Sequence, residues 1–150
     1  MDSGTSVKLV IPSEIKLIDL VHAASEKMAE LAGFDADDAL NVGLAVREAV
    51  INAMLHGNKR DPGLKVSVTL TTDHRELRAR VTDEGNGFDP GQARDPTAPD
   101  NLMSDSGRGL LLMEAFVDKL QFKKRRHGGT EVTLIKLLPV NADDEGKKEL

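Results

Sequence analysis

Three polar side chains recur at intervals of four residues along an otherwise apolar stretch, at Glu48, Asn52 and His56. Residues 40–55 are apolar on almost every side, which predicts a buried helix carrying these three side chains on one face. Burying a carboxylate is costly unless it is paired or its pKa shifts, so such a helix usually lines a cavity. There the carboxylate could act as a general base and the amide oxygen could bind a metal or ligand. The alternative is a solvent-edge position, with Glu48 paired to a basic residue elsewhere.

A second acidic residue ends an alternating strand. Asp83 falls on the same face as the apolar residues at alternate positions before it, and Gly85 and Gly87 follow. A carboxylate in this position could accept a hydrogen bond from a ligand amine, because glycines allow another group to approach the backbone closely. The alternative is an ordinary turn, since Asp, Asn and Gly are favoured turn residues.

A third motif opens a predicted helix after a long irregular segment, and consists of Ser106, Gly107, Arg108, Gly109 and Leu110. A helix N-terminus offers free N–H groups and a positive dipole end to an anion. The guanidinium of Arg108 suits phosphate oxygens. The alternative is a simple helix cap with a flexible approach.

Together the three motifs form an inventory for ATP and Mg²⁺: an acid for an amine, a helix N-terminus for phosphates, and Glu and Asn for base and metal. The sequence contains no G-x-x-x-x-G-K-[ST], so this is not a P-loop site. It also lacks the H-R-D and D-F-G motifs of eukaryotic-type kinases.

The elements that must position these motifs follow from periodicity and punctuation. A strand is expected at 7–11, a helix from an N-cap at Ser13 to Gly33, and a second helix from about Asp35 to His56. Later elements are expected at 64–70, about 77–82, 107–116, about 120–122 and from Thr130. This order predicts an α+β fold, a two-layer α/β sandwich with a mainly antiparallel mixed sheet and helices on one face.

Composition limits the classes of function. A chain of 150 residues fits one domain, expected at 1–138, with a polar and disordered tail at 139–150. The absence of cysteine excludes disulfides, thiolate zinc sites and cysteine nucleophiles. The net charge of −5 disfavours direct nucleic-acid binding, and the basic run 123–126 is interpreted as a solvated sheet edge. The N-terminus lacks signal-peptide features and no apolar run is long enough for a membrane span, so we expect a cytoplasmic protein.

The motifs carry a family resemblance in their order along the chain. Residues 48–58 resemble the N-box of the GHKL (Bergerat) ATP-binding fold, and 83–88 and 106–110 resemble its two glycine boxes. Gly129 and Thr130 resemble the late Gly-Thr pair that lies near the adenine. Within this superfamily, residues 7–138 look most like the bacterial anti-sigma-factor serine/threonine kinases.

The resemblance implies a role for each motif. Asp83 would accept a hydrogen bond from the adenine amine with help from Thr130, and Asn52 would hold Mg²⁺ at the phosphates. Glu48 would be the general base that activates a serine or threonine hydroxyl. Arg108 would stabilise charge on the phosphates. The other residues expected to border the nucleotide are His56, Gly85, Gly87, Ser106, Gly107, Gly109 and Leu110.

The resemblance also implies partners. The segment 88–105 would be an ATP lid, the substrate a small anti-sigma-factor antagonist, and the second partner a sigma factor, which makes the protein a regulator of transcription. Such kinases are usually homodimers. Two alternatives stay open: a non-catalytic binding module switched by nucleotide, and a detached histidine-kinase catalytic domain. The latter is disfavoured because no phosphoacceptor histidine on a dimerising helix pair is visible.

Overall fold

The computed structural model describes residues 4–85 and 106–139. Within these ranges the elements are β1 (Thr5–Pro12), η1 (Ile15–Leu17), α1 (Ile18–Ala32), α2 (Ala36–Asn52), η2 (Ala53–Gly57), β2 (Lys65–Thr72), β3 (Glu76–Asp83), α5 (Ser106–Phe116), β4 (Lys119–Lys124) and β5 (Thr130–Leu137). Their order confirms the predicted α+β succession of strands and helices. The predicted lid at 88–105 and the tail beyond residue 139 lie outside the described residues.

The described strands form one sheet in the order β1-β2-β3-β5-β4. Every pairing between them is antiparallel, so the mixed component of the prediction does not occur in this part of the chain. An apolar row crosses the sheet through directly paired residues, namely Leu9, Val68, Val81, Val132 and Phe122. The last strand in sequence, β5, therefore lies between β3 and β4.

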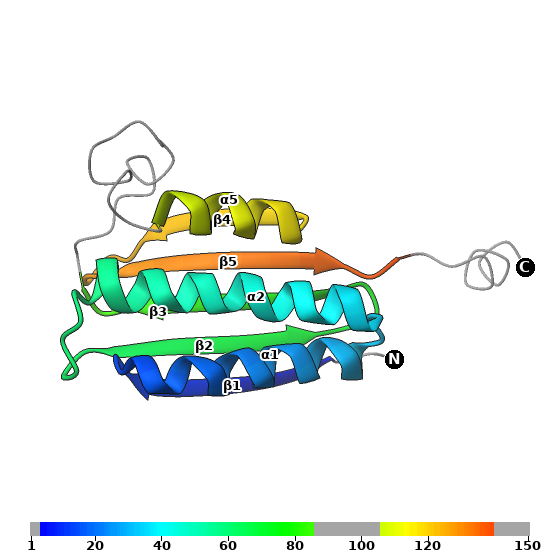
Figure 1. Ribbon diagram of the computed structural model, residues 1–150, viewed down its shortest axis with the longest axis horizontal. Coiled ribbons are helices and arrows are strands. Elements are labelled where there is room, and N and C mark those ends of the chain that lie inside the picture. The colour runs from blue at the N-terminus through cyan, green and yellow to red at the C-terminus, as the bar shows by residue number, and fades with distance from the viewer. Residues whose placement is uncertain (1–3, 86–105, 140–150) are drawn as a thin grey trace, which may run out of the picture.

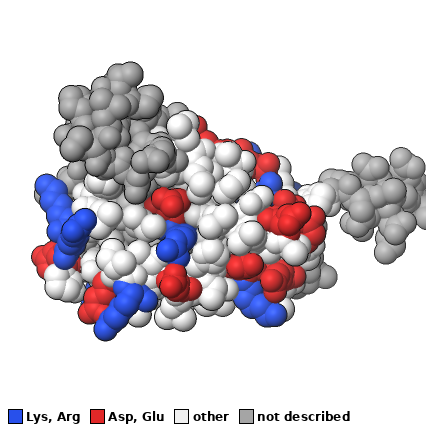
Figure 2. Space-filling view, viewed as in Figure 1, with Lys and Arg blue, Asp and Glu red and all other residues white. Residues whose placement is uncertain are grey.

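The helices α1, α2 and α5 lie side by side over one face of this sheet (Figure 1). Alternate residues of β2 and β3 face the helices and are fully buried, as alternation predicts. The apolar side of α2 completes the core with Val42, Val46 and Val50, and η2 adds Met54. Lys and Arg side chains lie among Asp and Glu side chains on the face seen in Figure 2, so charges of both signs are interspersed there.

Helix boundaries mostly follow the local signals. The carboxylate of Asp35 accepts a hydrogen bond from the Asp38 N–H at 2.8 Å, which is the expected N-cap of α2. Helix α1 ends at Gly33, whose φ of 109° is a left-handed conformation that glycine adopts without strain. In the part of the chain that the structure describes, no helix is both long and apolar enough to cross a membrane.

The predicted N-cap at Ser13 is wrong. Residue Glu14 precedes the short helix η1 and makes no side-chain cap. The Ser13 hydroxyl is buried and instead donates to the Leu64 carbonyl at 2.8 Å. A buried hydroxyl needs a hydrogen-bond partner. At the end of β1 the partner within reach is the Leu64 carbonyl, just before β2, and not a backbone N–H at the start of a helix.

We predict that Asp35→Ala lowers the free energy of unfolding by about 1 kcal/mol, because the first turn of α2 loses its side-chain cap. Asp37→Ala is the matched control, since it removes the same charge from the first turn without removing the cap. Urea denaturation of the two variants measures the difference. Equal losses would show that the charge, and not the cap, supplies the stability.

Candidate nucleotide-binding site

The helix that carries Glu48 and Asn52 changes geometry before it ends. Helix α2 stops at Asn52 and continues as a π-helical turn, η2, through Gly57. The Asn58 N–H donates to the Ala53 carbonyl at 2.7 Å, a bond that spans five residues. Single π turns in proteins occur frequently at functional sites. The result here is that Gly57 lies against the end of β3.

Asp83 ends β3 with a buried carboxylate. It is 3 % exposed, as its position on the apolar face predicts. Its Oδ1 accepts hydrogen bonds from the backbone N–H groups of Thr130 and Gly85, both at 3.1 Å. The carboxylate is therefore oriented by two backbone donors from different segments.

Three glycines surround this carboxylate, and none leaves room for a side chain. A Cβ on Gly57 would overlap the carboxylate of Asp83, and one on Gly85 would overlap the Gly57 carbonyl. A Cβ on Gly129 would overlap the Asp83 carbonyl, and its φ of 95° also favours glycine. The close approach that the sequence predicted for Gly85 is thus found, with two more glycines taking part.

The surroundings shift the pKa values of Asp83 and His56 in this region. Burial raises the pKa of Asp83, while hydrogen bonds from Thr130 and Gly85 and the charge of Arg125 act in the opposite direction. Burial also lowers the pKa of His56, and the charge of Arg60 lowers it further. The His56 imidazole is consequently favoured in its neutral form.

The start of α5 packs directly on the polar residues of α2. A Cβ built on Gly109 would lie 2.7 Å from Glu48 Oε2 and 3.9 Å from Asn52 Nδ2. Glycine at this position therefore lets the helix that opens with the third motif approach the carboxylate and the amide. Leu110 is buried in the hydrophobic core, which leaves its backbone for any contact with a nucleotide.

Asn52 has an unsatisfied polar atom. Its side chain is 4 % exposed, and its Nδ2 has no hydrogen-bond partner among the described residues. A buried amide without a partner is costly, which suggests that a ligand completes it. Rotation of the amide can present either its nitrogen to a phosphate oxygen or its oxygen to Mg²⁺. The residues present therefore fit a nucleotide with its metal.

Not every predicted site residue is placed. Gly87 lies outside the described residues, as do the side chains of Ser106 and Arg108, while the backbone of 106–108 belongs to α5. No group of three or more His, Asp or Glu side chains that could hold a metal occurs within 4–85 and 106–139. Mg²⁺ commonly binds through one or two protein groups and substrate phosphates, so such a group is not required.

Sequence reasoning missed two residues of the site. Arg125, interpreted as part of a solvated sheet edge, donates from Nη1 to the Asp83 carbonyl at 2.8 Å. Asn58 is buried and accepts from the Glu84 N–H at 2.9 Å through Oδ1. Neither contact has a local sequence signal, because the partners are 42 and 26 residues apart.

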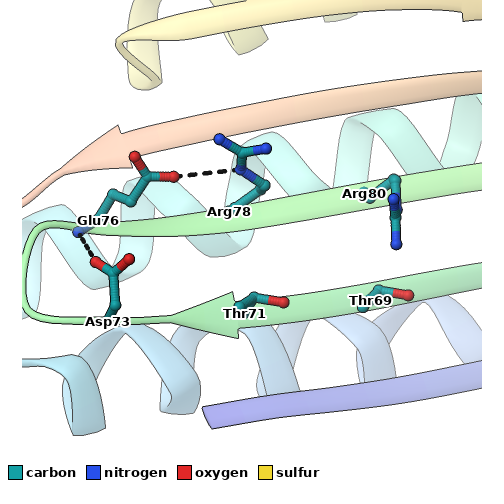
Figure 3. A pocket seen from close by; sticks show the side chains of 6 residues that line it. All are labelled: Thr69, Thr71, Asp73, Glu76, Arg78 and Arg80. Atoms are coloured by element: carbon teal, nitrogen blue, oxygen red, sulfur yellow. Dashed lines mark hydrogen bonds and ion pairs between the residues drawn. The ribbon is translucent and has the colours of Figure 1, made fainter. Parts of the chain in front are cut away.

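A separate hollow of about 350 Å³ lies on the sheet face opposite the helices (Figure 3). Its polar groups pair with one another: Arg78 contacts Glu76 at 3.2 Å, and the Glu76 N–H donates to Asp73 at 3.0 Å. Alternation along β3 puts Arg78 and Arg80 on the face opposite Asp83. This hollow is therefore not part of the candidate site.

Comparison with known proteins finds relatives over most of the chain. Residues 11–136 match the family described as the histidine kinase-like ATPase domain. The chain is 28 % identical over 138 residues to the serine-protein kinase RsbW of Bacillus subtilis, covering 88 % of this chain and 85 % of that protein. It is 35 % identical over 104 residues to the anti-sigma F factor of Geobacillus stearothermophilus, covering 67 % and 70 %.

A solved structure has the same fold. The crystal structure of the RsbU and RsbW domains of a Mycobacterium tuberculosis protein aligns with a TM-score of 0.63 and 22 % sequence identity. The alignment covers 89 % of this chain and 32 % of that longer chain. This likeness concerns the fold alone.

We predict that Gly57→Ala lowers the free energy of unfolding by about 1–3 kcal/mol, because the new methyl group would overlap the buried carboxylate of Asp83. Gly63→Ala is the control, since Gly63 is exposed and a Cβ built on it would meet only Asp61 Oδ1, at 3.2 Å. Thermal unfolding of both variants measures the effect. A Gly57→Ala protein as stable as the Gly63→Ala protein would contradict the close packing described here.

We predict that Asp83→Asn gains stability relative to the wild type as the pH rises above 3.8, the ordinary pKa of this carboxyl. Burial raises the pKa of Asp83 in the folded protein, so the unfolded chain releases its proton first and wild-type stability falls as the pH rises. The amide of the variant does not titrate. Denaturation curves of both proteins between acid and neutral pH would show the widening difference, whereas a constant difference would contradict the raised pKa.

Proposed function

The chain belongs to the histidine kinase-like ATPase domain family, and we propose that it is an ATP-dependent serine/threonine protein kinase and anti-sigma factor. Its substrate would be a small anti-sigma-factor antagonist, and it would also sequester a sigma factor. The observation that carries the proposal is the packing of Gly109 against Glu48 and Asn52, which brings a carboxylate and an unsatisfied amide to the N-terminus of α5.

Adenine recognition is assigned to Asp83. Its carboxylate is buried, and its Oδ1 is already engaged by two backbone donors. Oδ2 then accepts the hydrogen bond from the exocyclic amine of the adenine. The buried Thr130, whose backbone N–H donates to Oδ1, lies beside the carboxylate in space. The low dielectric of this position strengthens a correct hydrogen bond and penalises a base that lacks the amine.

The transfer step is assigned to Glu48. Its carboxylate accepts the proton of the serine or threonine hydroxyl as that oxygen bonds to the γ-phosphorus and the bond to the β–γ bridging oxygen breaks, which leaves ADP. The backbone N–H groups at the start of α5 would stabilise the developing negative charge, and Arg108 would add its guanidinium. Asn52 would hold Mg²⁺, which neutralises charge on the phosphates when bound.

The partners are proposed from the relatives. Proteins named serine-protein kinase and anti-sigma F factor match over most of this chain, at identities from 26 % to 35 %. We carry both roles to this chain, together with a homodimer, which the family resemblance implies. The alternative is a binding module that changes shape with nucleotide and transfers nothing, and the experiment below separates the two.

We predict that Glu48→Gln lowers phosphate transfer by about 100-fold or more while ATP binding is retained, because the amide cannot accept the hydroxyl proton. The assay incubates the protein with γ-labelled ATP and Mg²⁺ and, one at a time, the candidate antagonist proteins of the source organism. Nucleotide affinity is measured separately by calorimetry. Glu30→Gln, a carboxylate-to-amide change on α1, is the matched control.

Three outcomes would contradict parts of the proposal. Unchanged labelling by the Glu48→Gln protein would remove Glu48 from the role of base. Tight ATP binding without transfer to any antagonist would favour the binding module, and acid-labile self-labelling would favour histidine-kinase chemistry.

A further inference from the structure

One peptide group at the end of β3 is held from two sides by side chains. The carbonyl of Asp83 accepts a hydrogen bond from Arg125 Nη1 at 2.8 Å. The N–H of Glu84 donates to Asn58 Oδ1 at 2.9 Å. These two polar groups belong to the same planar peptide unit, so the two side chains together fix its rotation about the chain.

Asn58 is itself held rigidly. It is 1 % exposed, and its Nδ2 donates to Ser13 Oγ at 2.8 Å and to the Lys65 carbonyl at 3.0 Å. The Ser13 hydroxyl in turn donates a hydrogen bond to the Leu64 carbonyl. Through these hydrogen bonds, Asn58 connects the 83–84 peptide to the end of β1 and to the start of β2.

Arg125 reaches the same peptide from the β5 side of β3, whereas Asn58 reaches it from the β2 side. Arg125 lies in the turn between β4 and β5, and its own N–H donates to the Gly129 carbonyl at 2.9 Å. The next residue, Thr130, donates its N–H to Asp83 Oδ1. The same turn thus holds both the main chain and the side chain of Asp83.

We propose that Asn58 and Arg125 are positioning residues that set the direction of the Asp83 carboxylate and thereby the preference for a 6-aminopurine nucleotide. The proposal rests on the proposed function, because it concerns the same nucleotide site. A rotation of the 83–84 peptide turns the Cα–Cβ bond of Asp83 and moves Oδ2 away from the line of the amine. Neither residue needs to touch the nucleotide for this effect.

The test compares two nucleotides that differ only at the amine. ATP carries it, and purine riboside triphosphate has hydrogen in its place. We predict that Arg125→Gln lowers the ratio of the two affinities about tenfold, the value of one well-placed hydrogen bond to a charged group. Arg125→Lys, which restores one donor, should recover part of the ratio.

Arg126→Gln is the matched control, because Arg126 is an exposed cation in the same turn. A general effect of charge on the triphosphate changes both affinities equally and leaves the ratio unaltered. Calorimetric titration of each protein with each nucleotide gives the ratio directly. Thermal unfolding identifies variants that lose stability alone.

Asn58 is tested with Asn58→Leu, which removes the acceptor of the Glu84 N–H, and with Asn58→Asp, which keeps it. Asn58→Leu should lower the ratio more than Asn58→Asp, and if Asn58→Leu does not fold, the Arg125 series carries the test. In an Asp83→Asn background, Arg125→Gln should have no further effect on the ratio, because the group being positioned is already changed.

Different binding results would contradict the assignment of Asp83 and the positioning role of Arg125. A wild-type protein that does not bind ATP, or binds both nucleotides equally, overturns the assignment of Asp83 and the inference with it. A wild-type protein that prefers ATP, with the same preference in Arg125→Gln, overturns the inference and leaves the proposed function intact.

Discussion

The burial of the Asp83 carboxylate is the constraint on which the rest of the site depends. A charged group removed from water needs donors held in place. Here the backbone N–H groups of Thr130, in β5, and of Gly85, two residues after β3, supply them. Those donors reach the carboxylate only because glycines at 57, 85 and 129 let three backbone segments come together without side chains between them. The pKa of Asp83 is nevertheless raised, because burial disfavours the charged carboxylate more than these donors favour it.

A single continuous segment connects this carboxylate to the chemistry at the other end of the site. Helix α2 carries Glu48 and Asn52 toward α5, and the π turn that follows delivers Gly57 to Asp83 and Asn58 to the 83–84 peptide. One helix therefore sets the distance between Asp83, which is assigned to the adenine, and Glu48 and Asn52, which are assigned to phosphate transfer. A rigid connection of this kind lets recognition of a base place the phosphates accurately.

Much of this could be predicted from the sequence, and the exceptions have a common cause. Alternation placed Asp83 on the buried face, helical spacing placed Glu48 and Asn52 together, and the four ordered motifs indicated the family that residues 11–136 match. Ser13, Asn58 and Arg125 were misread or missed because their hydrogen bonds join segments that are far apart in the chain. In sequence, a serine before a helix resembles an N-cap, and an arginine in a basic run resembles a solvated residue. Only the folded structure shows that these side chains bond to the carbonyls of Leu64 and Asp83.

The insertion of β5 between β3 and β4 has a consequence for the order of assembly. Asp83 obtains the Thr130 N–H and the Arg125 guanidinium only after the final hairpin has docked, more than forty positions later in the chain. A nascent polypeptide leaving the ribosome can form β1, α1, α2, β2 and β3 while this carboxylate still lacks its long-range donors. The hydrogen bonds that hold this carboxylate are therefore completed only when β4 and β5 join the sheet.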